Sequence, residues 1–70
     1  MPSTVIRSFD YRPEKRELDV QFVTGRRYVY FEVPQDEVDR LRTSGSRGRY
    51  FNRHIRDRYR YRELERSGRE

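Results

Sequence analysis

An alternation of apolar and polar residues in segment 17–23 constrains the fold of this chain more than any other feature of the sequence. The apolar positions are Leu18, Val20 and Phe22, and a polar residue separates each from the next. Because successive side chains of a strand point to opposite faces, a strand here would have one apolar face. Such a face must be covered by another layer, so the alternation predicts a sheet that is packed on one side.

Two further strands are predicted beside this one. Residues 5–11 and 27–33 are rich in the β-branched and aromatic residues that are typical of strands. Residues 12–15 read Arg-Pro-Glu-Lys and suit a type I turn, which favours proline at its second position. The three strands are therefore expected to form an antiparallel meander.

The connection between the second and third strands allows two registers. A two-residue turn would place both tyrosines of the third strand on the face opposite the aliphatic residues. A three-residue loop, with Gly25 in a left-handed conformation, pairs Val20 with Tyr28 and Leu18 with Tyr30. We prefer the loop, because it collects the large rings and the aliphatic side chains on one face and puts glycine where a positive φ is needed.

Two short helices are predicted after the strands. The first starts with Pro34 as its first helical residue, carries acidic residues in its first turn and ends by Gly45. Val38 and Leu41 lie three residues apart and mark its buried face.

The second helix is predicted to follow Ser46, which caps it, and to run to about Arg56 or Arg58. Phe51 and Ile55, four residues apart, form its buried face. Beyond it, alternating tyrosines and arginines predict a short terminal strand or an extended arm. The predicted architecture is α+β: a three-stranded antiparallel meander followed by two short helices packed on one face of it.

The composition excludes several classes of protein. The chain of 70 residues has no cysteine and one histidine, so it can form neither a disulfide framework, a thiolate zinc site nor a multi-histidine metal centre. His54 has no cysteine nucleophile to activate, and no catalytic residue, metal ligand or cofactor is predicted. There is no apolar run long enough to span a membrane and no apolar segment typical of a signal peptide, so a cytoplasmic location is expected.

Charge is distributed unevenly along the chain. Residues 1–39 carry a net charge of −2 and residues 40–70 carry +7, which gives the total of +5. The basic residues are almost all arginine, which binds phosphate and carboxylate groups through two parallel hydrogen bonds and stacks on flat rings. This asymmetry is typical of a surface that binds a polyanion.

The candidate binding residues are arginines and tyrosines of this basic half. Those expected to contact phosphates or to stack on bases are Arg47, Arg49, Arg53, Arg56, Arg58, Arg60, Tyr50 and Tyr59. Residues 44–49 combine two glycines, two arginines and a helix start, which could hold a phosphate, although an ordinary linker between helices has the same composition. For the whole set, the alternative is a solvated basic face that is balanced by nearby acids.

An ordered set of residues resembles a known family. The matching positions are Ile6 and Tyr11, then Leu18-x-Val20-x-Phe22-x-x-Gly25, Tyr28-x-Tyr30-x-x-Val33-Pro34 and Ser46-x-Gly48-x-Tyr50-Phe51-Asn52-x-x-Ile55. This pattern resembles the KTSC domain, which occurs at the C terminus of some lysyl-tRNA synthetases and in small stand-alone bacterial or phage proteins. Arg60 departs from the family pattern, which has proline there. The resemblance spans residues 3–62 as a single domain, with residues 63–70 predicted to be a flexible tail.

The association with a synthetase implies RNA as a partner, and the basic half of the chain points the same way. We therefore predict a small non-enzymatic binding module that contacts RNA or another single-stranded nucleic acid. The alternative is a protein-interaction module that docks an acidic partner or forms a homodimer. No membrane partner is predicted.

Overall fold

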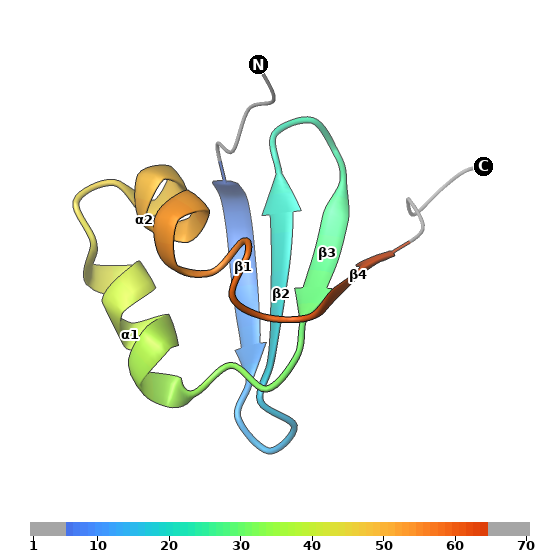
Figure 1. Ribbon diagram of the computed structural model, residues 1–70. Helices are drawn as coiled ribbons and strands as arrows, with labels where there is room; N and C mark the ends of the chain where they lie inside the picture. Colours follow the sequence, from blue (N-terminus) through green and yellow to red (C-terminus); the bar gives the residue numbers. More distant parts are fainter. Residues whose placement is uncertain (1–5, 65–70) are drawn as a thin grey trace.

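The computed structural model describes residues 6–64, which form a four-stranded antiparallel sheet with two helices on one face (Figure 1). The strands β1 (Ile6–Arg12), β2 (Glu17–Phe22), β3 (Arg27–Tyr30) and β4 (Tyr61–Leu64) follow the spatial order β1-β2-β3-β4. The helices α1 (Gln35–Thr43) and α2 (Arg47–His54) lie between β3 and β4 in the sequence. The α+β class, the meander and the two helices are thus confirmed, and the C-terminal segment is a strand.

The register of the second hairpin is the predicted one. Val20 lies opposite Tyr28, and Leu18 lies opposite Tyr30. Gly25 has a φ of 94°, in the region that favours glycine, and its N–H donates to the carbonyl of Phe22 over 2.9 Å. The three-residue loop therefore brings the rings of β3 to the aliphatic face of β2.

The third strand is shorter than predicted. It ends at Tyr30 instead of residue 33, because Glu32 adopts a left-handed φ of 57° that turns the chain out of the sheet. Pro34 also lies one position before its predicted place: its ψ of 156° is extended, so it precedes α1, and its carbonyl accepts the N–H of Glu37 over 3.0 Å. A proline φ suits either position, so the sequence alone did not separate them.

The capping residues of the two helices differ from those predicted. After α1 the capping residue is Ser44 in an extended conformation, so Gly45 is not needed as a left-handed terminator. Ser46 occupies the N-cap position of α2, but its side chain makes no capping hydrogen bond. The last turn of α2 closes early, because the N–H groups of Ile55 and Arg56 both donate to the carbonyl of Phe51 over 2.9 Å.

The C-terminal boundary lies later than predicted. Glu63 and Leu64, which the sequence assigned to the tail, belong to β4 and pair with β3. The strand extends this far because the antiparallel register places Leu64 opposite Arg27, the first residue of β3. The remaining residues of the predicted tail, 65–70, and Val5 of the predicted first strand lie outside the described residues.

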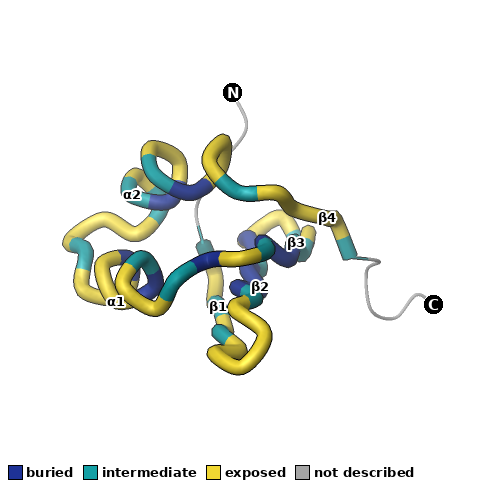
Figure 2. The backbone as a smooth tube through the Cα atoms, turned by 60° about the horizontal axis from the view of Figure 1, so that its bottom comes forward, coloured by how far each residue is buried: buried dark blue, intermediate teal, exposed yellow. Residues whose placement is uncertain are grey.

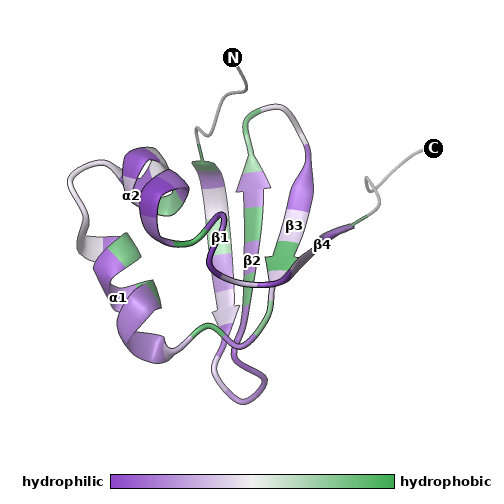
Figure 3. Ribbon diagram, viewed as in Figure 1, coloured by the Kyte–Doolittle hydropathy of each residue, from purple (hydrophilic) through white to green (hydrophobic). Residues whose placement is uncertain are grey.

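The core lies between the sheet and the helices, where the buried residues gather (Figure 2). Apolar and polar bands alternate along β2, and apolar residues lie in part of β3 and on the inner sides of both helices, whereas β4 and the outer sides of the helices are polar (Figure 3). Phe51 of α2 meets the rings of Phe22 and Tyr30 edge-on, at centroid distances of 5.4 and 5.2 Å. The buried cluster comprises Leu18, Val20, Phe22, Tyr30, Val33, Val38, Leu41, Phe51 and Ile55. The faces predicted for both helices are therefore the faces that pack, and Tyr28 is partly buried at the edge of this core.

On the opposite face of the sheet, arginine side chains cover a buried carboxylate. Asp19 is 6% exposed, and its carboxylate accepts a hydrogen bond from Arg27 over 2.8 Å. Arg12 lies 3.8 Å from the same carboxylate and also 3.8 Å from Glu17. These arginines serve to neutralise a buried acid, which would be costly to bury alone.

Candidate functional site

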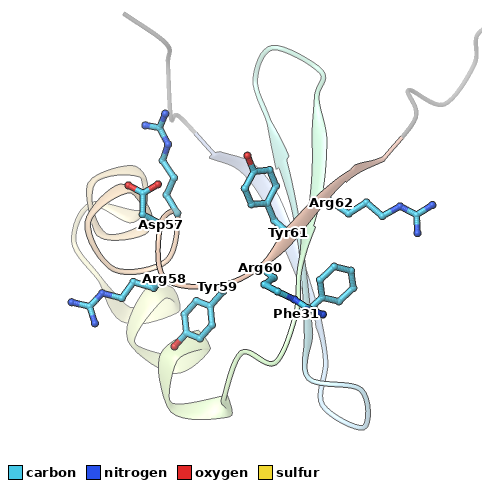
Figure 4. Close-up of a pocket in the computed structure, with 8 residues that line it drawn as sticks. Phe31, Asp57, Arg58, Tyr59, Arg60, Tyr61 and Arg62 are labelled. Atoms are coloured by element: carbon cyan, nitrogen blue, oxygen red, sulfur yellow. The ribbon is translucent and has the colours of Figure 1, made fainter.

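A surface groove of about 810 Å³ follows the connector, residues 55–60, which leads from α2 to β4 (Figure 4). Phe31, just beyond β3, forms part of its wall, and the N–H of Phe31 donates to the carbonyl of Arg60 over 2.9 Å. The other lining residues come from the connector and β4: Arg56, Asp57, Arg58, Tyr59, Arg60, Tyr61 and Arg62. We call this feature the connector groove.

The connector groove is strongly basic. Its lining residues include four guanidinium groups and one carboxylate, a net charge of +3. Among the described residues, no carboxylate lies within 4.0 Å of the guanidinium of Arg47, Arg49, Arg53, Arg56, Arg58, Arg60 or Arg62. In contrast, Arg12, Arg26, Arg27 and Arg42 each have such a partner. Within residues 6–64, these seven arginines therefore have no carboxylate partner that an external anion would have to displace.

The structure separates the predicted arginines into three places. Arg47 lies over the ring of Phe9 in β1 at 5.8 Å, as does Arg42 of α1, so it links the start of α2 to the sheet. Arg49 and Arg53 lie one turn apart on the exposed side of α2. Arg56, Arg58 and Arg60 line the connector groove, where Arg56 also donates to the side chain of Asn52 over 2.8 Å.

The two tyrosines predicted to stack on bases are held by a common carboxylate. Glu37 of α1 accepts the hydroxyl of Tyr50 over 2.5 Å and that of Tyr59 over 3.1 Å. Burial is the largest cause that raises the pKa of each tyrosine, and the negative charge and hydrogen bond of Glu37 raise it further. The ring of His54 packs against that of Tyr50 at 4.4 Å. This Glu37 clamp joins α1 to α2 and to the connector, so both rings are partly committed to the fold.

Sequence reasoning did not select Phe31 or Tyr61, which also line the connector groove. Tyr61 is 55% exposed, the more exposed of the two large apolar side chains that stand out on the described surface. Its position follows from the pairing of β4 with β3, which sets Tyr61 opposite Tyr30. The sequence shows that tyrosine and arginine alternate in this segment, but it does not show with which strand the segment pairs.

Two features were sought in the described residues, a helix that could span a membrane and a cluster of side chains that could hold a metal ion. None of the helices in residues 6–64 is long and apolar enough to cross a membrane. In the same range, no group of three histidine, cysteine or acidic side chains could hold a metal ion.

Comparison with known families and structures identifies relatives that share this fold. The sequence model of the KTSC domain matches residues 2–59. A solved structure of a KTSC domain protein from Yersinia pestis superposes with a TM-score of 0.85 and 29% sequence identity, covering 93% of this chain and 92% of that one.

Curated relatives are of two kinds. A lysine–tRNA ligase from Nostoc punctiforme is 31% identical over 61 residues, which is 87% of this chain and 11% of the ligase. A protein from Stutzerimonas stutzeri is 40% identical over 52 residues and is matched over 73% of its length. The chain thus spans a small part of the bacterial ligases that it matches but most of the shorter relative.

Proposed function

Because the chain belongs to the KTSC domain family, we propose that it acts as a small non-enzymatic binding module whose partner is RNA. The observation that carries this proposal is the connector groove, where four guanidinium groups accompany a single carboxylate. Planar guanidinium groups match the geometry of phosphate oxygens, and neutralising phosphates releases counterions from the nucleic acid. The ligases among the relatives, which are named for tRNA, support RNA as the nucleic acid.

The proposal predicts an affinity that depends strongly on salt and weakly on base sequence. Contacts to phosphates supply binding energy without selecting bases. For single strands, the slope of log K against log salt is about −0.7 for each phosphate contacted. Fluorescence anisotropy of a labelled single-stranded RNA, titrated with protein at several salt concentrations, measures both the affinity and this slope.

A matched pair of double variants locates the contact. Arg58→Ala/Arg60→Ala removes two charges from the connector groove, and the hydrogen bonds that the connector makes through these two residues use backbone atoms that alanine keeps. Arg7→Ala/Lys15→Ala removes the same charge from exposed positions in β1 and the turn after it. We expect the first variant to bind more weakly and to flatten the salt slope by about one unit, and the second to change little.

A third variant, Arg49→Ala/Arg53→Ala, tests whether the contact extends along the exposed side of α2. Equal losses in the groove variant and in the Arg7/Lys15 control would mean diffuse attraction to a basic protein. A wild-type protein that binds no RNA at low salt would overturn the proposal. The same basic surface would then suit an acidic protein partner.

A further inference from the structure

The ring of Tyr61 is exposed on one side and supported on the other. Its centroid lies 5.4 Å from that of Tyr30 and 5.5 Å from that of Tyr28, so two rings of β3 stand behind it. Tyr30 is 3% exposed and packs edge-on against Phe51, which fixes this support in the core. Tyr61 itself is 55% exposed, so a flat partner can reach the ring without displacing core side chains.

Arginines flank this ring along the chain. Arg60 and Arg62 are its neighbours along the chain, and the side chain of Arg62 leaves β4 in a different direction from the Tyr61 ring (Figure 4). Burial is the largest cause that raises the pKa of Tyr30; the nearby charge of Asp57 also raises it, whereas that of Arg56 lowers it. The groove that Tyr61 lines is therefore also lined by the guanidinium groups of Arg56 and Arg62.

We propose that Tyr61 stacks on an unpaired base of a single-stranded RNA while Arg56 and Arg62 contact the flanking phosphates. This inference rests on the proposed function and specifies its ligand. In a duplex the base faces are covered by their neighbours, so only an unpaired base can offer a π face to an exposed ring. The clamped rings of Tyr50 and Tyr59 take no part in this contact, because Glu37 holds their hydroxyls in the fold.

The test compares two substitutions of the same side chain. Tyr61→Phe keeps the ring and removes the hydroxyl, whereas Tyr61→Leu keeps an apolar side chain and removes the π face. The probe is a single-stranded RNA of about ten nucleotides, within the usual site sizes, that carries one fluorescent 2-aminopurine base. We expect Tyr61→Phe to bind like the wild type and Tyr61→Leu to lose about tenfold in affinity.

Two further measurements test whether a base stacks on Tyr61. Stacking on Tyr61 should change the emission of 2-aminopurine with the wild type and with Tyr61→Phe, but not with Tyr61→Leu. A duplex RNA of the same length should bind the wild type about tenfold more weakly than the single strand, because it offers charge without an open base face. Circular dichroism checks that each variant is folded, and Phe31→Leu is the control for a second aromatic side chain of the groove, one that Glu37 does not hold.

Several outcomes would overturn the inference. If Tyr61→Leu binds the single strand as tightly as Tyr61→Phe, the base does not stack on Tyr61, while RNA binding itself stands. A loss confined to Phe31→Leu, or equal affinity for duplex and single strand, would have the same consequence. If polyglutamate displaces the RNA as effectively as unlabelled RNA, the surface recognises charge alone and suits an acidic protein. If the wild type binds neither RNA, the proposed function fails together with the inference.

Discussion

At the scale of single residues, Glu37 connects α1 to both α2 and the connector. It receives one hydroxyl from α2 and another from the connector, so its removal leaves both tyrosines without their acceptor. We expect Glu37→Ala to lower the free energy of unfolding by about 1–3 kcal/mol, the usual effect of losing hydrogen bonds to a charged group. Urea unfolding followed by circular dichroism measures this change.

Asp36→Ala is the matched control for Glu37→Ala. Asp36 also lies in the first turn of α1, where a carboxylate interacts favourably with the helix dipole, but it is exposed. Its substitution should cost only a few tenths of a kcal/mol up to about 1 kcal/mol. Equal effects of the two substitutions would show that the helix dipole, and not the clamp, is what Glu37 contributes.

Tyr30 predicts how stability responds to alkaline pH. Burial is the largest cause that raises the pKa of its phenol above the ordinary value, and Tyr61 and Tyr28 add to it. The folded state thus holds the phenolic proton more tightly than the unfolded state does. In the unfolded state the phenol titrates at about pH 10. The resulting stabilisation is fully present below that pH and is lost as the pH rises above it. Thermal melts across this range should show a steeper loss for the wild type than for Tyr30→Phe, and parallel curves would contradict the assignment.

At the scale of elements, the β2–β3 hairpin depends on one glycine. Gly25 has a φ of 94°, and a Cβ built there would meet no atom within 4 Å, so backbone strain and not crowding opposes a side chain. We expect Gly25→Ala to cost about 1–2 kcal/mol in the free energy of unfolding. Gly45→Ala is the control, because that site has equal space and no positive φ. It should leave stability unchanged or raise it slightly, by up to about 1 kcal/mol. Similar losses in both variants would remove the conformational explanation.

The same hairpin shows what sequence reasoning can reach. The alternation of β2 and the glycine of the loop are local signals, and together they fixed the pairing of Val20 with Tyr28. The buried faces of both helices were also predictable. The spacing of Val38 and Leu41 in α1, and of Phe51 and Ile55 at α2, indicates which side is apolar. The end of α2 was not, since it depends on backbone hydrogen bonds that residue types do not encode.

The site was harder to predict than the fold for the same reason. Exposure of Arg49 and Arg53 follows from helical spacing. The partner of Tyr50 and Tyr59 is Glu37, which lies 13 and 22 residues away in the sequence. Contacts at such separations exist only once the helices have docked, so no local pattern shows which tyrosines Glu37 holds.

At the scale of the whole molecule, core and charge are divided between different parts of one small fold. The buried cluster lies between the sheet and the helices. On the other face of the sheet, Arg12 and Arg27 form ion pairs with Asp19. β4 extends the sheet beyond β3, and the connector leads to it from α2 (Figures 1 and 2). Substitutions of exposed side chains in the connector groove should therefore change binding with little change in stability, whereas core substitutions should abolish both.

Substitution of Phe51 tests the prediction that core residues carry the stability of the fold. This residue is 1% exposed, belongs to α2 and meets Phe22 and Tyr30 of the sheet, so it joins the two layers. Phe51→Ala should cost about 3–5 kcal/mol as a large-to-small change in a buried site. A domain of this length has little more stability than that in total, so we expect the variant to be largely unfolded at room temperature. Val23→Ala, which truncates a side chain that is 50% exposed, should stay within about 0.5 kcal/mol of the wild type. Circular dichroism during urea titration distinguishes the two, and a folded Phe51→Ala protein with an unchanged melting temperature would place the contact between α2 and the sheet outside the cooperative core.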